Sequence, residues 1–328
     1  MPARRTLPEP GWTVFASPPH QGRDFLGHRS YYVGAPLFVA TQEDHPRPHC
    51  AIEAGGKEVD VLIPDALAGA LGPILSVETP PQGSAFHVVI VTTSHGRFVM
   101  KRGTTPATTA ELADEARILD VLRAERPFVA APVGIGADAE TGTFAFTYID
   151  GETMLAALAR ADVAQRHRLV ARFGQALRRV HGWAPPLPRP DDWLTMMIER
   201  EQARMHELPE GAVIAGTQTR FDGMDARRVA TDLRAWRPSV TTDLVFGHGD
   251  YCLPNVVVSH GAVVGIIDWS RGGYADRRFD LATALFNLRY NLGDTAYLTT
   301  FLRAYGYAEP VATLHMFEAL HALTCFWV

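Results

Sequence analysis

Short apolar runs in the first half of the chain predict β-strands. Residues 86–91 and 98–101 are mostly apolar, and a Ser-His-Gly turn separates them. Residues 144–149 alternate as Phe-Ala-Phe-Thr-Tyr-Ile, and residues 76–78 form a shorter run of the same kind. Apolar or alternating runs bounded by turn residues are typical of strands. We therefore predict a small sheet between residues 76 and 149, with the turn Asp150-Gly151 closing it.

Helical spacing of apolar residues characterises the second half of the chain. Asp162 precedes an apolar stripe and is a good N-cap residue. Further helices are predicted over residues 193–208, 226–236, 281–288 (capped by Asp280), 295–305 and 310–328. One helix comes earlier: it opens at Thr108, where Glu111 completes a capping box. Because strands come first and most helices later, the chain is expected to be an α+β protein with a small mixed lobe and a larger helical one.

A hairpin follows the predicted helix at 226–236. Residues 256–258 and 263–267 are β-branched runs separated by Ser-His-Gly-Ala, which is a hairpin pattern. Folding about Gly261 and Ala262 pairs Asn255 with Asp268, at about 5 Å between Cβ atoms. An amide and a carboxylate held together in this way suit a hard, oxygen-preferring cation such as Mg²⁺.

The residues that lead into this hairpin carry candidate chemistry. The spacing from Asp250 to Asn255 matches the kinase catalytic loop H-R-D-L-x-x-x-N, in which Asp orients the attacking hydroxyl and Asn holds a metal ion. Lys101, at the end of a predicted strand, and Glu115, on the helix after it, precede this loop in the order that a kinase requires. Taken singly, a strand-end lysine is usually a solvated edge charge and a helix carboxylate a surface group. Only the ordered set favours phosphoryl transfer.

Composition and charge narrow the class of protein. The chain has 328 residues, of which 47% are hydrophobic and 20% charged, with a net charge of −5, as in ordinary globular proteins. Without a basic tract we expect no nucleic-acid partner. Three widely spaced cysteines favour a reducing compartment over a disulfide framework. There is no apolar signal core and no run long enough to span a bilayer, so we expect a cytoplasmic protein without membrane contact.

The sequence also resembles a known family, the aminoglycoside 3′-phosphotransferases and the wider group that includes choline and macrolide kinases. The resemblance covers roughly residues 65–320, and its motifs fall in the expected order. They are Lys101, Leu112-Ala-Asp-Glu115, Arg179-Val-His181, His248-Gly-Asp250, Cys252-Leu-Pro-Asn255, Ile267-Asp268 with Arg271, Ala275-Asp-Arg277 and Asp280-Leu-Ala282.

This resemblance implies a protein-kinase-like fold, with ATP or GTP bound between two lobes and Mg²⁺ as a further cofactor. Residues 65–149 would form the nucleotide-binding lobe, and residues 150–328 the helical lobe with the catalytic and metal loops and the substrate site. Residues 1–64 are an extension without a counterpart in the family.

The resemblance also implies roles for individual residues. Asp250 would be the catalytic carboxylate, Asn255 and Asp268 would hold Mg²⁺, and His248 and Asp280 would support the loop. The implied nucleotide contacts are Lys101, Glu115, Gly83, Ser84, Ala85, Phe86 and the backbone near Tyr148.

The acceptor-binding positions depart from the family pattern. In the family, acidic side chains in the last helix and after the Asp280-type helix grip a polycationic antibiotic, but the positions here are Ala322, Leu323 and Tyr290. The candidate substrate contacts that remain are Arg271, Asp222 and Asp225. Arg271 has an equally good alternative as a surface salt-bridge partner of Asp276.

We expect an O-phosphotransferase that acts on a hydroxyl of a small molecule, an aminoglycoside or other antibiotic, as a resistance enzyme and as a monomer or homodimer. A kinase for a non-cationic, sugar-like or secondary metabolite is the first alternative. A protein kinase is a weaker one, because the chain lacks a G-x-G-x-x-G loop and an A-P-E segment and has Trp269-Ser270 where D-F-G would continue. An inactive nucleotide-binding protein is the last alternative.

Overall fold

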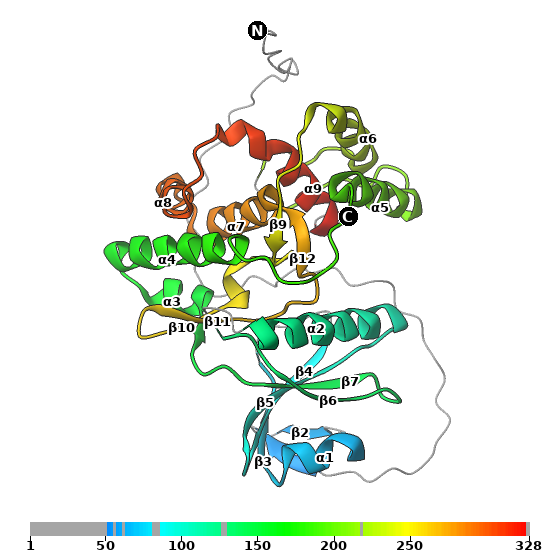
Figure 1. Ribbon diagram of the computed structural model, residues 1–328, viewed down its shortest axis with the longest axis vertical. Coiled ribbons are helices and arrows are strands. Elements are labelled where there is room, and N and C mark those ends of the chain that lie inside the picture. The colour runs from blue at the N-terminus through cyan, green and yellow to red at the C-terminus, as the bar shows by residue number, and fades with distance from the viewer. Residues whose placement is uncertain are drawn as a thin grey trace. The chain divides into compact units, whose positions relative to one another are not determined.

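A computed structural model describes residues 51–54, 57–60, 63–80, 86–125, 130–216 and 219–325, which all fall in one compact unit of the chain (Figure 1). Most of the expected extension over residues 1–64 lies outside the described residues, and so do Gly83, Ser84 and Ala85. No described helix combines the length and the hydropathy that a bilayer crossing requires.

An antiparallel five-stranded sheet forms the smaller lobe, as the alternating runs predicted. Its strands lie in the order β3-β4-β5-β7-β6. They are β3 (Ile74–Glu78), β4 (His87–Thr93), β5 (Gly96–Arg102), β6 (Gly134–Asp138) and β7 (Thr143–Thr147). A separate hairpin of β1 (Ala51–Ala54) and β2 (Lys57–Asp60) precedes helix α1 (Asp65–Leu71), which contacts β6. Leu67 of α1 is buried in one apolar cluster with Val91, Phe98 and Met100 of the sheet.

Helix α2 (Pro106–Glu125) begins two residues earlier than predicted. The reciprocal cap joins Thr105 and Thr108: each side-chain oxygen accepts from the backbone N–H of the other, at 3.2 and 2.9 Å. Pro106 follows the cap at the first helical position, where its missing N–H costs nothing. The predicted capping box of Thr108 and Glu111 is therefore wrong, because Thr105 already supplies the cap. The helix contacts β5, β6 and β7.

The larger lobe is mainly helical, and Figure 1 shows its helices on the other side of α2 from the five-stranded sheet. Helix α4 packs along α8, α5 along α6, and α7 along α9. Its helices are α3 (Met154–Arg160), α4 (Val163–His181), α5 (Trp193–Glu207), α6 (Ala226–Trp236), α7 (Arg277–Leu292), α8 (Thr295–Tyr305) and α9 (His315–Cys325), with short 3-10 helices at Arg237–Ser239, Leu253–Asn255 and Val311–Leu314. The α+β, two-lobed fold class is confirmed.

Two helix starts in this lobe test the capping predictions. Asp162 and Gln165 form a full capping box at the start of α4, as predicted for Asp162. Helix α7, however, is capped by Asp276, whose side chain accepts from the N–H of Arg278. Asp280 lies in the first turn of α7, and its prediction as a cap is wrong because its carboxylate bonds to another segment.

Two small antiparallel sheets position the loops of the larger lobe. One pairs β9 with β12, and the other has the order β11-β10-β8. Their strands are β8 (Glu152–Thr153), β9 (Leu244–Gly247), β10 (Val256–Ser259), β11 (Ala262–Ile266) and β12 (Gly273–Asp276).

The register of the β10–β11 hairpin differs from the prediction. The turn consists of His260 and Gly261, which both have positive φ, at 50° and 73°, as a type I′ turn requires. The predicted turn lies one residue too late. Ser259 pairs with Ala262, and a bulge then sets Val256 opposite Ile266. Asn255 and Asp268 are therefore not a directly paired couple, although Ile267 still donates a hydrogen bond to the Asn255 carbonyl at 2.9 Å.

Candidate active site

A buried cluster of three charged side chains joins the sheet to the larger lobe. Lys101 lies near the end of β5, and its Nζ donates to both carboxylate oxygens of Glu115, at 2.9 and 2.8 Å. The same Nζ donates to Oδ1 of Asp268 at 3.1 Å, across 167 positions of sequence. Glu115 lies on α2 and is 1% exposed. We refer to Lys101, Glu115 and Asp268 as the lobe-junction network.

The charges in the lobe-junction network support one another. Burial disfavours the charged ammonium of Lys101, but Asp268 and Glu115 outweigh that effect and the pKa of Lys101 is raised. Burial also acts against the Asp268 carboxylate, yet Lys101 holds its pKa below the usual value. For Glu115 burial wins: its pKa is raised, although hydrogen bonds from Lys101 and from the N–H of Trp269 oppose the shift. One ammonium thus serves two carboxyl groups, and neighbouring positive charge would be favourable.

Asp268 adopts an unusual backbone conformation. Its φ of 65° lies in the left-handed region, which costs a non-glycine residue about 1–3 kcal/mol and is concentrated at functional sites. The next residue is anchored twice: the Trp269 N–H donates to Glu115 at 3.2 Å, and its indole N–H donates to the Ile266 carbonyl at 2.8 Å. These contacts hold the strained turn after β11 in place.

Asp250 and Asn255 lie in the loop that links β9 to β10. Gly249, with φ of 78°, permits the sharp turn before Asp250, since a Cβ at this position would lie 2.2 Å from the carbonyl oxygen of Arg271. The Asn255 amide donates to the backbone carbonyl of Asp250 at 3.0 Å and approaches Oδ2 of Asp250 at 3.4 Å. The loop therefore fixes the two side chains relative to each other.

The donor set near this loop fits a Mg²⁺ ion that also binds phosphates. The Asn255 amide nitrogen is engaged by Asp250, which leaves the amide oxygen for a cation. The Asp268 side chain is 34% exposed, so its carboxylate can be reached from solvent. Among the described residues no group of three or more His, Cys, Asp or Glu side chains forms a complete metal cage. Mg²⁺ usually takes one or two protein oxygens and completes its shell with phosphates and water.

A second buried network supports the loop from behind. The Asp280 carboxylate accepts from the N–H groups of His248 and Gly249, at 2.7 and 2.9 Å. It also contacts Nε2 of His181 at 3.1 Å, and Nδ1 of His181 lies 2.8 Å from the hydroxyl of Tyr305. Burial alone would raise the pKa of Asp280, but His181 and the backbone N–H groups lower it. We refer to His181, Asp280 and Tyr305 as the bracing network.

His248 supports the same loop in another way. Its Nε2 lies 2.9 Å from the Ile267 carbonyl, and its Nδ1 lies 3.3 Å from the N–H of Asp250. The imidazole is fully buried, with its ring centroid 4.6 Å from that of Trp269. The side chain therefore ties the loop before Asp250 to the turn that carries Asp268.

Arg271 and His321 are the cationic groups whose charges reach Asp250. Burial raises the pKa of Asp250, and the charge of Arg271 opposes that shift. Burial lowers the pKa of His321 to about 4, against the charge of Asp250, so the imidazole is neutral at neutral pH. The alternative partner of Arg271 is taken: Asp276 is buried and pairs with Arg278 at 2.6 Å. Sequence reasoning missed His321, and its one signal was a lone histidine within the apolar residues of the last helix.

The remaining predicted site residues are placed unevenly. Phe86 lies near the lobe-junction network, with its ring centroid 5.9 Å from Lys101 Nζ. Tyr148 directly follows β7, and the Arg97 guanidinium lies 3.9 Å from its ring centroid. Asp225 is the N-cap of α6 and accepts from Arg228, whereas Asp222 is exposed before that helix. The structure thus groups the predicted catalytic and metal residues, while Asp225 has a structural use of its own.

Comparison with known proteins agrees with this arrangement. Residues 76–315 match the sequence profile of the phosphotransferase enzyme family. An aminoglycoside 3′-phosphotransferase of Niallia circulans is 48% identical over 67 residues, which span 20% of this chain and 26% of that protein. The chain therefore matches about a quarter of that relative's length.

Two longer similarities extend this result. An aminoglycoside 3′-phosphotransferase of Streptomyces fradiae is 30% identical over 202 residues, or 60% of this chain and 73% of that protein. The crystal structure of an aminoglycoside-3′-phosphotransferase of type VIII has a TM-score of 0.61 at 24% identity, covering 79% of this chain and 96% of that one. The latter similarity concerns the fold.

Proposed function

The chain belongs to the phosphotransferase enzyme family, and on that premise we propose that it is a Mg²⁺-dependent O-phosphotransferase. It moves the γ-phosphoryl group of ATP or GTP to a hydroxyl of a small molecule, which we propose is an aminoglycoside or another antibiotic. Residues 65–149 form the nucleotide-binding lobe in this proposal, and residues 150–328 carry the catalytic loop and the acceptor site.

One observation carries the proposal: Lys101 of the sheet contacts Asp268 of the larger lobe at 3.1 Å. That contact brings a lysine suited to bind phosphates to the carboxylate suited to hold Mg²⁺. Phosphoryl transfer depends mainly on positioning and on neutralising the charge of the phosphates. A bound Mg²⁺ would supply part of that neutralisation, with Asn255 and Asp268 as its protein ligands.

The proposed role of Asp250 is to orient the acceptor hydroxyl and receive its proton. Burial raises the pKa of this carboxyl, which makes it a better base than a solvated aspartate. The hydrogen bond from Asn255 to the Asp250 carbonyl fixes the loop, at 3.0 Å. Lys101, oriented by Glu115, would contact the phosphates, and Phe86 and Tyr148 would border the nucleotide.

The acceptor site supports a second candidate, a kinase for non-cationic hydroxylated compounds. Arg271 and His321 are the groups whose charges act on Asp250 from this side. Ala322 and Leu323 are fully buried apolar side chains next to His321, where an acidic grip would be needed. A polycationic acceptor gains much of its binding from opposed carboxylates, so this lining favours a neutral acceptor.

The test is Mg²⁺-dependent ADP release with an acceptor panel of aminoglycosides and neutral hydroxylated antibiotics. Asp250→Asn should lower kcat at least about 10²-fold with the best acceptor, the usual contribution of a positioned base. Asp114→Asn is the matched control, since Asp114 is a 60% exposed acid on α2. A wild-type rate in Asp250→Asn would contradict the role of Asp250.

The acceptor panel separates the two candidates. Turnover of aminoglycosides above that of neutral antibiotics would support the first, and the reverse order would support the second. Nucleotide binding without turnover of any acceptor would point instead to an inactive nucleotide-binding protein.

A further inference from the structure

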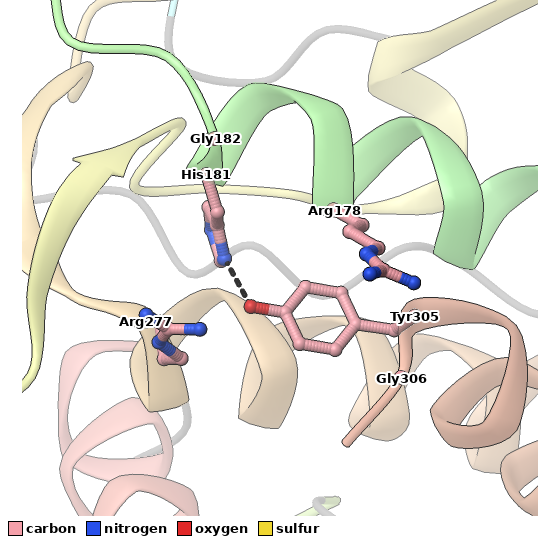
Figure 2. Close-up of a pocket in the computed structure, with 6 residues that line it drawn as sticks. All are labelled: Arg178, His181, Gly182, Arg277, Tyr305 and Gly306. Atoms are coloured by element: carbon pink, nitrogen blue, oxygen red, sulfur yellow. Dashed lines mark hydrogen bonds between the residues drawn. The ribbon is translucent and has the colours of Figure 1, made fainter.

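A cavity of about 300 Å³ lies where the ends of α4 and α8 meet the start of α7. Figure 2 shows the Tyr305 side chain between Arg277, beyond its hydroxyl, and Arg178, near its other end. The lining residues are Arg178, His181, Gly182, Arg277, Tyr305 and Gly306. Its side-chain groups are two guanidinium groups, an imidazole and a phenol, and no carboxylate is among them.

The two arginines differ in how far their charges are neutralised. Arg277 pairs with Asp243, with Nη2 to Oδ1 at 3.0 Å. Its Nε lies 2.6 Å from Oδ2 but in an angle that is not that of a hydrogen bond, so this buried N–H lacks a properly aligned acceptor. Arg178 is exposed and forms no salt bridge or hydrogen bond with any described residue. The cavity therefore holds one uncompensated positive charge.

The helix ends beside the cavity do not offset this charge with free carbonyl groups. Gly306, with φ of 87°, donates its N–H to the carbonyls of Leu302 and Arg303 at the end of α8. Gly182 does the same for Arg178 at the end of α4. A Cβ on Gly306 would lie 3.1 Å from Nη1 of Arg178. Glycine thus closes the helix and leaves room for the guanidinium.

We propose that this cavity binds a small oxyanion, such as inorganic phosphate or the phosphate group of a small metabolite, and that binding there stabilises the catalytic loop. The volume corresponds to several water molecules at about 30 Å³ each, and it lies at the lower end of ligand pockets. Guanidinium groups recognise phosphate through paired, charge-assisted hydrogen bonds. Nothing in the proposal requires the site between the lobes.

A continuous series of polar contacts connects the cavity with Asp250. The Tyr305 hydroxyl lies 2.8 Å from His181, and His181 lies 3.1 Å from Asp280. Asp280 in turn accepts from the N–H of Gly249, the residue before Asp250, at 2.9 Å. An anion that fixes Tyr305 and Arg178 acts on the first member of this series, so its binding energy is coupled to the order of the loop.

The first experiment measures the melting temperature of the full chain with inorganic phosphate, against sodium chloride at matched ionic strength. A tenfold excess over the dissociation constant should raise it by roughly 2 °C. The rise should vanish in Arg178→Gln and persist in Arg172→Gln, an exposed arginine of the same helix that does not line the cavity. No rise in the wild-type protein would overturn the proposal.

A third variant separates this cavity from the lobe junction, where phosphate could also bind. Arg271→Gln removes the exposed cation near Asp250 and should leave the rise intact. A rise that is lost in Arg271→Gln and kept in Arg178→Gln would place the anion at the lobe junction and overturn the cavity site.

The coupling is tested by hydrogen exchange of a peptide that contains His248 and Gly249. Phosphate should slow its exchange in the wild-type protein and leave it unchanged in Arg178→Gln. Unchanged exchange in the wild-type protein, together with a rise in melting temperature, would overturn the coupling and leave the anion site. Neither readout depends on enzyme activity, so failure here is distinguishable from failure of the proposed phosphotransferase function.

Discussion

The loop that carries Asp250 lies between two buried polar networks that differ in how completely they are satisfied. In the bracing network, His181 and Asp280 are 2% and 3% exposed, and the Asp280 carboxylate accepts hydrogen bonds from two backbone N–H groups. In the lobe-junction network, one ammonium faces two carboxyl groups, and Asp268 remains 34% exposed. The first arrangement favours a fixed backbone. The second retains negative charge that a cation can use.

The largest expected effect is on stability, from Asp280→Ala. The change leaves two buried N–H groups and His181 without their partner, and removing one partner of a buried polar pair costs about 3–5 kcal/mol. The measurement is the free energy of unfolding in urea, with Asp114→Ala as an exposed control expected to change it by less than about 0.5 kcal/mol. A small loss in Asp280→Ala would mean that the loop is fixed by other contacts.

The pH dependence of this effect has a definite sign. The folded pKa of Asp280 is lowered, so its stabilisation is fully present above the unfolded value of about 3.9. It is lost as the pH falls through the folded pKa. The difference between the wild-type protein and Asp280→Ala should therefore shrink on acidification below about pH 4.

A smaller effect, mainly on activity, is expected from Glu115→Gln in the lobe-junction network. The amide keeps the shape of the side chain and an acceptor for the N–H of Trp269, but Lys101 loses one of its two carboxylates. We expect kcat/KM for the nucleotide to fall about 10- to 100-fold, or about 1.4–2.7 kcal/mol. Glu111→Gln, an exposed acid on the same helix, is the control, and equal kcat/KM values in the two variants would contradict the role of Glu115.

The smallest effect is expected from Tyr305→Phe, at the edge of the bracing network. This variant removes one hydrogen bond to His181 and keeps the ring, so the free energy of unfolding should fall by about 1 kcal/mol. The same urea titration measures it. A loss as large as that of Asp280→Ala would show that Tyr305, and not Asp280, determines the order of the loop.

The sequence was informative where residue spacing alone specifies a structure. The strands around Lys101, the cap at Asp162 and the order of Lys101, Glu115 and Asp250 all depend on local pattern, and the fold class followed from them. The roles assigned to the individual site residues stay predictions. The hairpin register was beyond reach, because a two-residue turn at His260 and a bulge beyond it shift the pairing without any change in hydrophobic pattern.

Contacts made in three dimensions explain the other differences. Asp280 and Asp276 are both acceptable helix caps in sequence, and only the position of the loop at His248 decides which carboxylate is needed elsewhere. His321 gives no spacing signal, since its neighbour Asp250 is distant in the chain. The cavity at Arg178 likewise requires the ends of three helices to meet.

Helix α2 also determines where the two lobes can separate most easily. Its side chains Ile118, Leu119 and Leu122 are buried in the main apolar cluster of the larger lobe. Pulling the helix away from that cluster would expose all three, at about 1.5–3 kcal/mol each. Breaking the contact between Lys101 and Glu115 exchanges a salt bridge for hydration by water. In an opening motion Lys101 would therefore travel with the sheet while Glu115 stays behind, and the distance between them would report how far the lobes have opened.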